Sequence, residues 1–214
     1  MIIPDPARAG MFQEDVMNTA LQSLIEHQRQ RLNSLREDMH DLATAVADQV
    51  WDDFETQVED ATSDGFLFEL ADSTALSLAS SLSLSFHEAF EKRILPLFET
   101  LESTLNSRLE QNHSAYSAAR IDLSAMRQGL KIQQEVSEWI EEAIKSARPG
   151  FIRMLFSPTD VTSEAWDEAV REDARRVRRA LLALQPKITS HIRAKVQSLI
   201  RSARLSYDQW LDEL

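Results

Sequence analysis

The stretch between Gly10 and Gly65 contains neither glycine nor proline. Because tight turns depend on these residues, their absence predicts one uninterrupted element. Apolar residues recur there at steps of three and four, the heptad spacing of a coiled coil, at Met17, Leu21, Ile25, Leu32, Leu35, Met39, Leu42 and Val46, with Gln28 in the one gap. The pattern then drifts, as in a straighter helix, to Val50, Phe54 and Val58. The sequence predicts a helix of about 50 residues, roughly 75 Å long, that stops at 63–65.

Residues 66–91 fit either a strand or a helix. Alternation with serines is typical of a strand, and it is seen at Leu76, Leu78, Leu82, Leu84 and Phe86. Steps of four indicate a helix, and they run through Leu78, Leu82, Phe86, Phe90, Ile94, Leu97, Leu101, Leu105 and Leu109. Since no turn residue is present to close a hairpin, we predict a second long helix, kinked at Pro96.

Two more helical regions follow. One is expected over 114–147, weakened at Gly129 and ended by 148–150, with core candidates Met126, Leu130, Val136, Trp139, Ile140 and Ile144. The next begins at a cap, Thr162 or Ser163, and its apolar pattern resumes after Pro186. That proline either kinks one helix or opens a fifth. The four tryptophans are expected to anchor a core or an interface; they are Trp51, Trp139, Trp166 and Trp210.

These elements predict an all-α protein, an elongated antiparallel helical bundle with a long N-terminal coiled-coil-like helix. We expect three regions. Residues 1–147 form a long-helix bundle or coiled-coil region, and 148–162 form an apolar connector bounded by proline and glycine. Residues 163–214 form a basic helical hairpin or a kinked helix packed on the same bundle. Only 4 glycines and 6 prolines among 214 residues agree with few turns.

The sequence offers little support for catalysis. It has no cysteine, which excludes disulfides, thiolate metal sites and a cysteine nucleophile. Glu37/His40 and Glu110/His113 have the Glu-x-x-His spacing of ferritin-like di-iron bundles, but Glu37 and His40 lie off the apolar stripe. There is no glycine-rich nucleotide loop and no serine-hydrolase elbow. We expect no enzyme, no catalytic residue, no cofactor, no metal and no small-molecule substrate. With no apolar run long enough to span a membrane and no secretory signal, a cytoplasmic location is expected.

The net charge of −12 is unevenly distributed along the chain. From Glu37 to Glu91 there are fourteen acidic residues and no lysine or arginine. The candidate acidic face within this stretch comprises Asp48, Asp52, Asp53, Glu55, Glu59 and Asp60. From Arg171 to Arg204 ten basic residues accompany two acidic ones. The candidate basic face comprises Arg171, Arg175, Arg176, Arg178, Arg179, Arg193, Arg201 and Arg204.

Three interpretations of these faces remain open. In the first, both are solvated surfaces, whether or not they pack against each other inside the fold. Alternatively, the acidic face of one copy binds the basic face of another copy or of a different protein, because complementary potentials steer association and fix register. In the third interpretation the arginine-rich stretch binds nucleic acid or anionic lipid, although no named nucleic-acid motif accompanies it.

A short apolar segment, the candidate apolar tip, lies in the connector and comprises Phe151, Ile152, Met154, Leu155 and Phe156. It could close the end of the bundle as a short helix. It could also protrude and insert into a partner groove or a bilayer, with Arg148 and Arg153 near phosphates. Long helices with such a tip are similar in layout to the stalks of dynamin-like membrane-remodelling proteins.

The sequence thus favours a non-catalytic helical interaction or scaffold subunit, which acts through homo-oligomerisation or assembly into a larger protein complex. Its partner would be a protein or a second copy of the chain. One alternative is a peripheral membrane-associated or membrane-remodelling stalk that binds a membrane surface. A further alternative is an accessory protein associated with nucleic acid.

Overall fold

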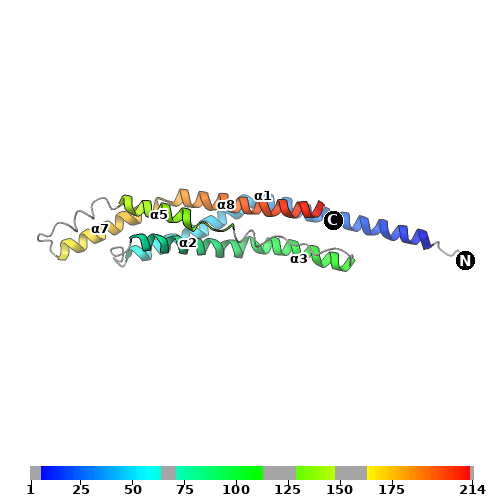
Figure 1. Ribbon diagram of the computed structural model, residues 1–214, viewed down its shortest axis with the longest axis horizontal. Coiled ribbons are helices and arrows are strands. Elements are labelled where there is room, and N and C mark those ends of the chain that lie inside the picture. Colours follow the sequence, from blue (N-terminus) through cyan, green and yellow to red (C-terminus); the bar gives the residue numbers. More distant parts are fainter. Residues whose placement is uncertain (1–5, 64–70, 113–128, 148–162, 213–214) are drawn as a thin grey trace.

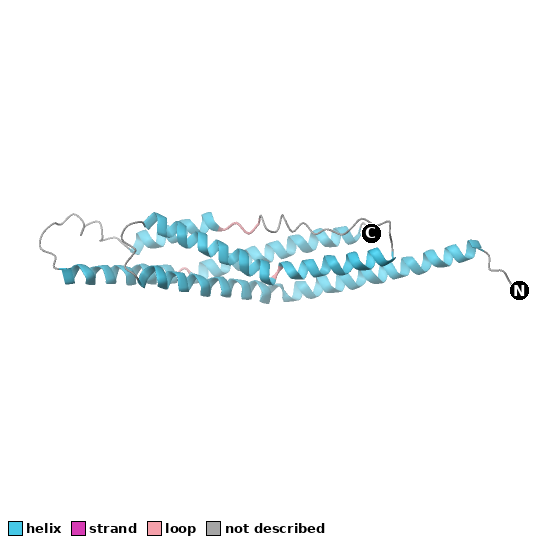
Figure 2. Ribbon diagram, turned by 90° about the horizontal axis from the view of Figure 1, so that it is seen from below, coloured by secondary structure: helices cyan, strands magenta, loops and turns pink. Residues whose placement is uncertain are grey.

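The computed structural model describes residues 6–63, 71–112, 129–147 and 163–212, and all regular structure in them is α-helical. The helices lie side by side in an elongated bundle (Figures 1 and 2). The predicted all-α helical bundle is therefore confirmed. The coiled-coil character of its first helix stays a prediction.

The first helix, α1, spans Pro6–Ser63 and has 58 residues, which makes it roughly 87 Å long at 1.5 Å per residue. It ends where the sequence predicts and begins earlier than the apolar stripe does. Pro6 opens it, as suits a residue with a helical φ and no N–H to satisfy. The heptad positions in its N-terminal half include the fully buried Gln28.

The two helices α2, Ala71–Arg93, and α3, Leu95–Asn112, form the second long element. The helical prediction for this region is correct, and the break lies beside Pro96 as expected. Proline has no N–H to donate. A tighter turn forms at this position, in which the Leu97 N–H donates to the Ile94 carbonyl, three residues earlier, at 3.1 Å.

The predicted helix over 114–147 is wrong in its extent. Residues 113–128 lie outside the described part of the chain, and residues 129–132 form a turn and an irregular segment. The helix α5 spans only Gln133–Ala147. Leu130 and Ile132 are both buried while Lys131 between them is exposed. An extended backbone places alternate side chains on one side, and a helix does not.

The C-terminal region contains α7, Ser163–Leu182, and α8, Gln185–Asp212. The helix start at Ser163 agrees with the sequence, which left Thr162 and Ser163 both open. Two residues separate the helices, and the Leu184 N–H donates to the Leu181 carbonyl at 3.0 Å in the tightened turn. Both helices run in the same direction along the bundle (Figure 1), so they do not fold back as a hairpin. Pro186 stands in the first turn of α8.

Successive elements alternate in direction, with α1 and α5 running one way and α2–α3 and α7–α8 the other (Figures 1 and 2). The central helix is α1, which contacts α2, α3, α7 and α8. The core between them is aliphatic and aromatic, and its largest fully buried side chains include Phe54, Phe86, Phe90 and Phe98. Trp51 belongs to this core, and Trp139 and Trp210 are partly buried against it. The side chain of Trp166 lies outside the described part.

The N-terminal part of α1 extends beyond the other described helices (Figures 1 and 2). Arg29 pairs with Asp212 in the last turn of α8. Because the two helices are antiparallel, the residues of α1 before Arg29 have no further described turns of α8 beside them.

Candidate interaction surface

The acidic and basic faces meet along the seam between α1 and the α7–α8 element. Glu59 on α1 pairs with Arg178 on α7. Further along, Asp48 accepts a hydrogen bond from Arg193 on α8 at 3.2 Å. These two pairs join the acidic and basic faces within one molecule. The remaining charged residues decide what the faces present to solvent.

Most of the acidic face remains at the surface of α1. Asp53 accepts a hydrogen bond from the Ser85 hydroxyl on α2, so its carboxylate helps to hold two helices together. Asp52 and Asp60 are exposed and Glu55 is half-buried. The carboxylates of Asp52 and Glu55 make no ion pair within the described residues. This part of α1 therefore presents negative charge outward.

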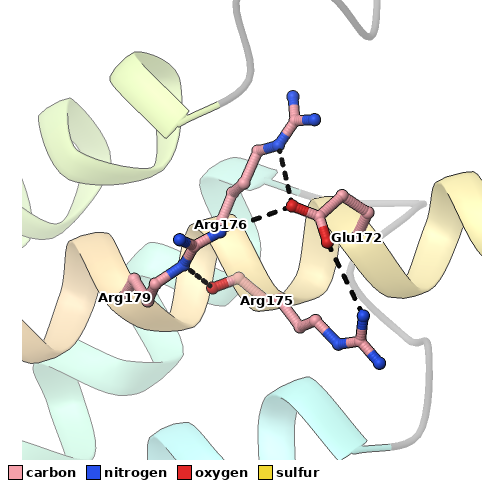
Figure 3. Close-up of polar contacts among 4 residues, drawn as sticks. All are labelled: Glu172, Arg175, Arg176 and Arg179. Atoms are coloured by element: carbon pink, nitrogen blue, oxygen red, sulfur yellow. Dashed lines mark hydrogen bonds and ion pairs between the residues drawn. The ribbon is translucent and has the colours of Figure 1, made fainter.

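The basic face is densest on α7. Arg175, Arg176 and Arg179 surround the single carboxylate of Glu172 (Figure 3), with closest N–O distances of 3.6, 3.4 and 3.4 Å respectively. Arg179 also donates to the main-chain carbonyl of Arg175 at 3.3 Å. One carboxylate cannot neutralise three guanidinium groups, so the cluster carries excess positive charge.

Exposure shows that this arginine cluster is available to a partner. The side chains of Arg175 and Arg179 are 71% and 72% exposed, and Arg171 one turn earlier is also exposed. Exposed ion pairs such as those with Glu172 are worth only about 0–1 kcal/mol each. Each guanidinium has five N–H donors, so many donors still face solvent. A partner carboxylate or phosphate would find them already positioned.

The basic face becomes less accessible toward the C-terminus. Arg201 is exposed on α8, whereas Arg204 is half-buried. Burial, reinforced by the nearby Arg36, lowers the pKa of Arg204. Its Nε atom has no hydrogen-bond partner within the described structure. Arg204 thus belongs to the packing of α1 against α8 more than to an outward surface.

A surface groove lies between α1 and α3, and sequence patterns gave no sign of it. It encloses about 690 Å³. The lining combines leucines with the polar residues of one ridge of α1; it comprises Arg31, Ser34, Leu35, Asp38, Asp41, Leu42, Ala45, Leu97 and Leu101. A groove of this kind depends on how two helices pack together, and the sequence of neither helix alone predicts that packing.

A second feature missed from the sequence is an aromatic and cationic contact between α5 and α8. The Trp139 ring meets the ring of His191 edge-on with centroids 5.2 Å apart. The Lys187 ammonium lies 4.3 Å from the Trp139 centroid, a cation–π contact. Trp139 thereby anchors α5 to α8, as expected of an interface tryptophan.

The apolar tip Phe151–Phe156 lies outside the described residues, so neither of its two interpretations is tested. Glu37 and His40 are exposed on α1, away from the core. Over residues 6–63, 71–112, 129–147 and 163–212, no cluster of histidine and carboxylate side chains has the composition of a metal site. None of the helices in this described part combines the length and apolar character needed to cross a bilayer.

Comparison with known proteins finds no matching family model, no matching curated protein and no matching solved structure.

Proposed function

We propose that this protein is a non-catalytic helical interaction subunit that assembles with a second copy or with another protein through its charged faces. The observation that carries the proposal is the incomplete use of these faces inside the fold. Two ion pairs, Glu59–Arg178 and Asp48–Arg193, each join one residue of the acidic face to one residue of the basic face. The arginine cluster of α7 stays exposed.

The internal ion pairs support this proposal. Carboxylates of α1 already pair with guanidiniums of α7 and α8 across helices that lie far apart in sequence. The same groups on two molecules would attract each other. Such complementarity raises association rates and fixes register, and it weakens as salt screens exposed charges.

The test is the solution mass, measured by light scattering after size-exclusion chromatography. We expect assembly at about 0.02 M salt that loosens at about 0.5 M, as the Debye length falls from roughly 20 Å to roughly 4 Å. Replacing Arg175 and Arg179 by Glu should abolish the assembly. Replacing Asp52 and Glu55 by Lys should do the same. Combining all four substitutions should restore it, because the charges then complement one another again.

A matched control uses two exposed lysines outside the basic face. Lys92→Glu with Lys131→Glu changes the net charge as much as the arginine variant does, and both residues are exposed. This control should assemble like the parent chain. A mass of one chain at both salt concentrations would contradict self-assembly through these faces, as would equal loss in the control.

The exposed arginines favour one second candidate, an accessory protein that binds nucleic acid. Guanidinium groups bind phosphates well, and salt-dependent affinity would follow from released counterions. The acidic surface of α1 opposes this candidate, because it repels a polyanion. A mobility shift at low salt that is lost in the Arg175→Glu, Arg179→Glu variant would support it. Unshifted nucleic acid at low salt would exclude it.

A further inference from the structure

The groove between α1 and α3 combines an apolar floor with an acidic edge. Leu35 and Leu101 are buried in the floor, while Leu97 is 37% exposed within it. Arg31, which also lines the groove, donates a hydrogen bond to the Thr104 hydroxyl at 3.5 Å and so connects α1 to α3. A concave surface with an apolar floor suits a large apolar side chain of a partner, because the anchors of an interface fill desolvated pockets.

The acidic edge comes from Asp38 and Asp41, which line the groove from α1. Both residues are exposed, and neither makes an ion pair within the described structure. The groove therefore suits an occupant that carries large apolar side chains next to a positive charge.

This chain contains one segment with that chemistry. The sequence Arg148-Pro-Gly-Phe-Ile-Arg-Met-Leu-Phe156 has five large apolar residues, and Arg148 and Arg153 stand before and within them. It contains no acidic residue. Its composition thus complements both the leucines and the carboxylates of the groove.

The segment cannot reach the groove of its own molecule from α5. Ser85 on α2 bonds Asp53 on α1, and Gln133 on α5 bonds Ser80 on α2. α5 runs parallel to α1, and α2 runs antiparallel to both (Figures 1 and 2). At 1.5 Å per residue, these contacts place Ala147 roughly 40 Å along the bundle from Ala45. Ala45 is the groove residue closest to the C-terminal end of α1. Phe151 follows Ala147 by four residues, which span at most roughly 14 Å.

The segment cannot reach the groove from its other end, at the start of α7, either. Arg178 pairs with Glu59, and Ser163 precedes Arg178 by 15 residues on α7, so Ser163 lies roughly 43 Å along the bundle from Ala45. Phe156 precedes Ser163 by seven residues, which reach roughly 25 Å. Only another molecule can supply this segment.

We propose that the α1–α3 groove binds the Phe151–Phe156 segment of a second copy of this chain. This inference rests on the proposed self-assembly and names a specific contact within it. Groove and segment are different parts of the chain, so the contact is either reciprocated in a two-fold dimer or repeated head-to-tail. Repetition of such a contact would produce a ring or a filament according to the rotation between copies.

The experiment titrates a fluorescent peptide of residues 148–157 onto full-length protein and follows anisotropy. The protein carries Phe151→Ser and Phe156→Ser, so that its own segment does not compete. We expect saturable binding with one peptide per chain. Asp38→Lys with Asp41→Lys should weaken binding at least tenfold, and Leu97→Ser should weaken it several-fold. A peptide with both phenylalanines replaced by serine should not bind.

Matched controls lie on other exposed surfaces. Leu205 on α8 is 58% exposed, so Leu205→Ser tests the loss of a leucine away from the groove. Glu88→Lys with Glu142→Lys repeats the charge change on α2 and α5, where both residues are exposed. These variants should bind the peptide like the parent. Equal binding by the groove variants, or no saturable binding, would overturn the proposal.

Three further outcomes separate this inference from neighbouring ones. Peptide that binds vesicles of anionic lipid but not the protein would overturn the proposal and assign the segment to a membrane surface. Salt-sensitive assembly without peptide binding would overturn the groove contact while leaving the proposed function intact. A parent chain that stays monomeric at low salt, even where the peptide binds, would contradict both the contact between copies and assembly through the charged faces.

Discussion

The hydroxyl of Tyr207 on α8 donates a hydrogen bond to the main-chain carbonyl of Leu101 on α3 at 3.3 Å. Tyr207 is almost fully buried. Burial, and secondarily the negative charge of Glu102, raise the pKa of Tyr207 far above its usual value near 10. The neutral hydroxyl is therefore strongly preferred in the folded protein.

This preference predicts alkaline destabilisation. Above pH 10 an unfolded Tyr207 releases its proton while the folded one retains it, so the folded state binds more protons and stability falls as pH rises. The loss from this residue reaches at most about 1.4 kcal/mol per pH unit. Tyr207→Phe should remove that part of the slope in urea unfolding from pH 9 to 11. A slope that stays unchanged in Tyr207→Phe would contradict the assignment.

Gln28 offers a test at a buried polar group. Its side chain is fully buried, and neither its amide nitrogen nor its oxygen has a hydrogen-bond partner in the described structure. An unpaired buried polar group costs about 1–3 kcal/mol. Gln28→Leu continues the apolar pattern of α1 and should raise the free energy of unfolding by about that amount. Urea denaturation measures it.

Gln22 provides the matched control for this substitution, because it is exposed on the same helix. Gln22→Leu should leave the free energy of unfolding within about 0.5 kcal/mol of the parent. A loss of stability in Gln28→Leu would show that its amide is satisfied in solution.

Leu84 and Phe86 distinguish a helix from a strand in α2. A strand places both residues on one face, whereas a helix separates them. Phe86 is fully buried and Leu84 is 59% exposed. Phe86→Ala should therefore cost about 3–5 kcal/mol, and Leu84→Ala about 0.5 kcal/mol or less. Comparable losses in chemical denaturation would contradict the helical packing.

The long helices were predictable because their signals are local. The absence of turn residues between Gly10 and Gly65 predicts an uninterrupted helix that ends near 63–65, although α1 begins at Pro6, before Gly10. In α2 the steps of four through Leu78, Leu82 and Phe86 outweigh the competing alternation. Pro96 marks the break between α2 and α3, since its missing N–H acts in the chain itself.

The start of α5 could not be predicted in the same way. Leu130, Val136 and Ile140 fit one helical pattern, but the burial of Leu130 and Ile132 on either side of exposed Lys131 follows from packing against other elements. Gly129 marks a weak point without showing that the helix is absent at 129–132. Tertiary contacts decide the backbone at such positions.

The sequence predicted the charge of the acidic and basic faces, but not which of their residues form ion pairs. Segregated charge in the sequence identifies α1 as acidic and α7–α8 as basic. Which carboxylate meets which guanidinium depends on the direction and register of the helices. The groove depends in the same way on Leu97 and Asp38 meeting across two elements, so no single stretch of sequence contains it.

The pair of Asp48 and Arg193 provides the last prediction. Their side chains are 58% and 39% exposed, so solvent screens them and exposed pairs of this kind contribute about 0.2–1 kcal/mol. A double-mutant cycle with Asp48→Asn and Arg193→Gln isolates the interaction energy from other effects of each substitution. We expect a coupling within that range from urea denaturation at about 0.02 M salt, and a smaller one at about 0.5 M because screening shortens the Debye length. The cycle must be run where light scattering shows a single species, so that assembly does not contribute. A coupling of zero at low salt would mean that packing alone, without this pair, sets the register of α8 on α1.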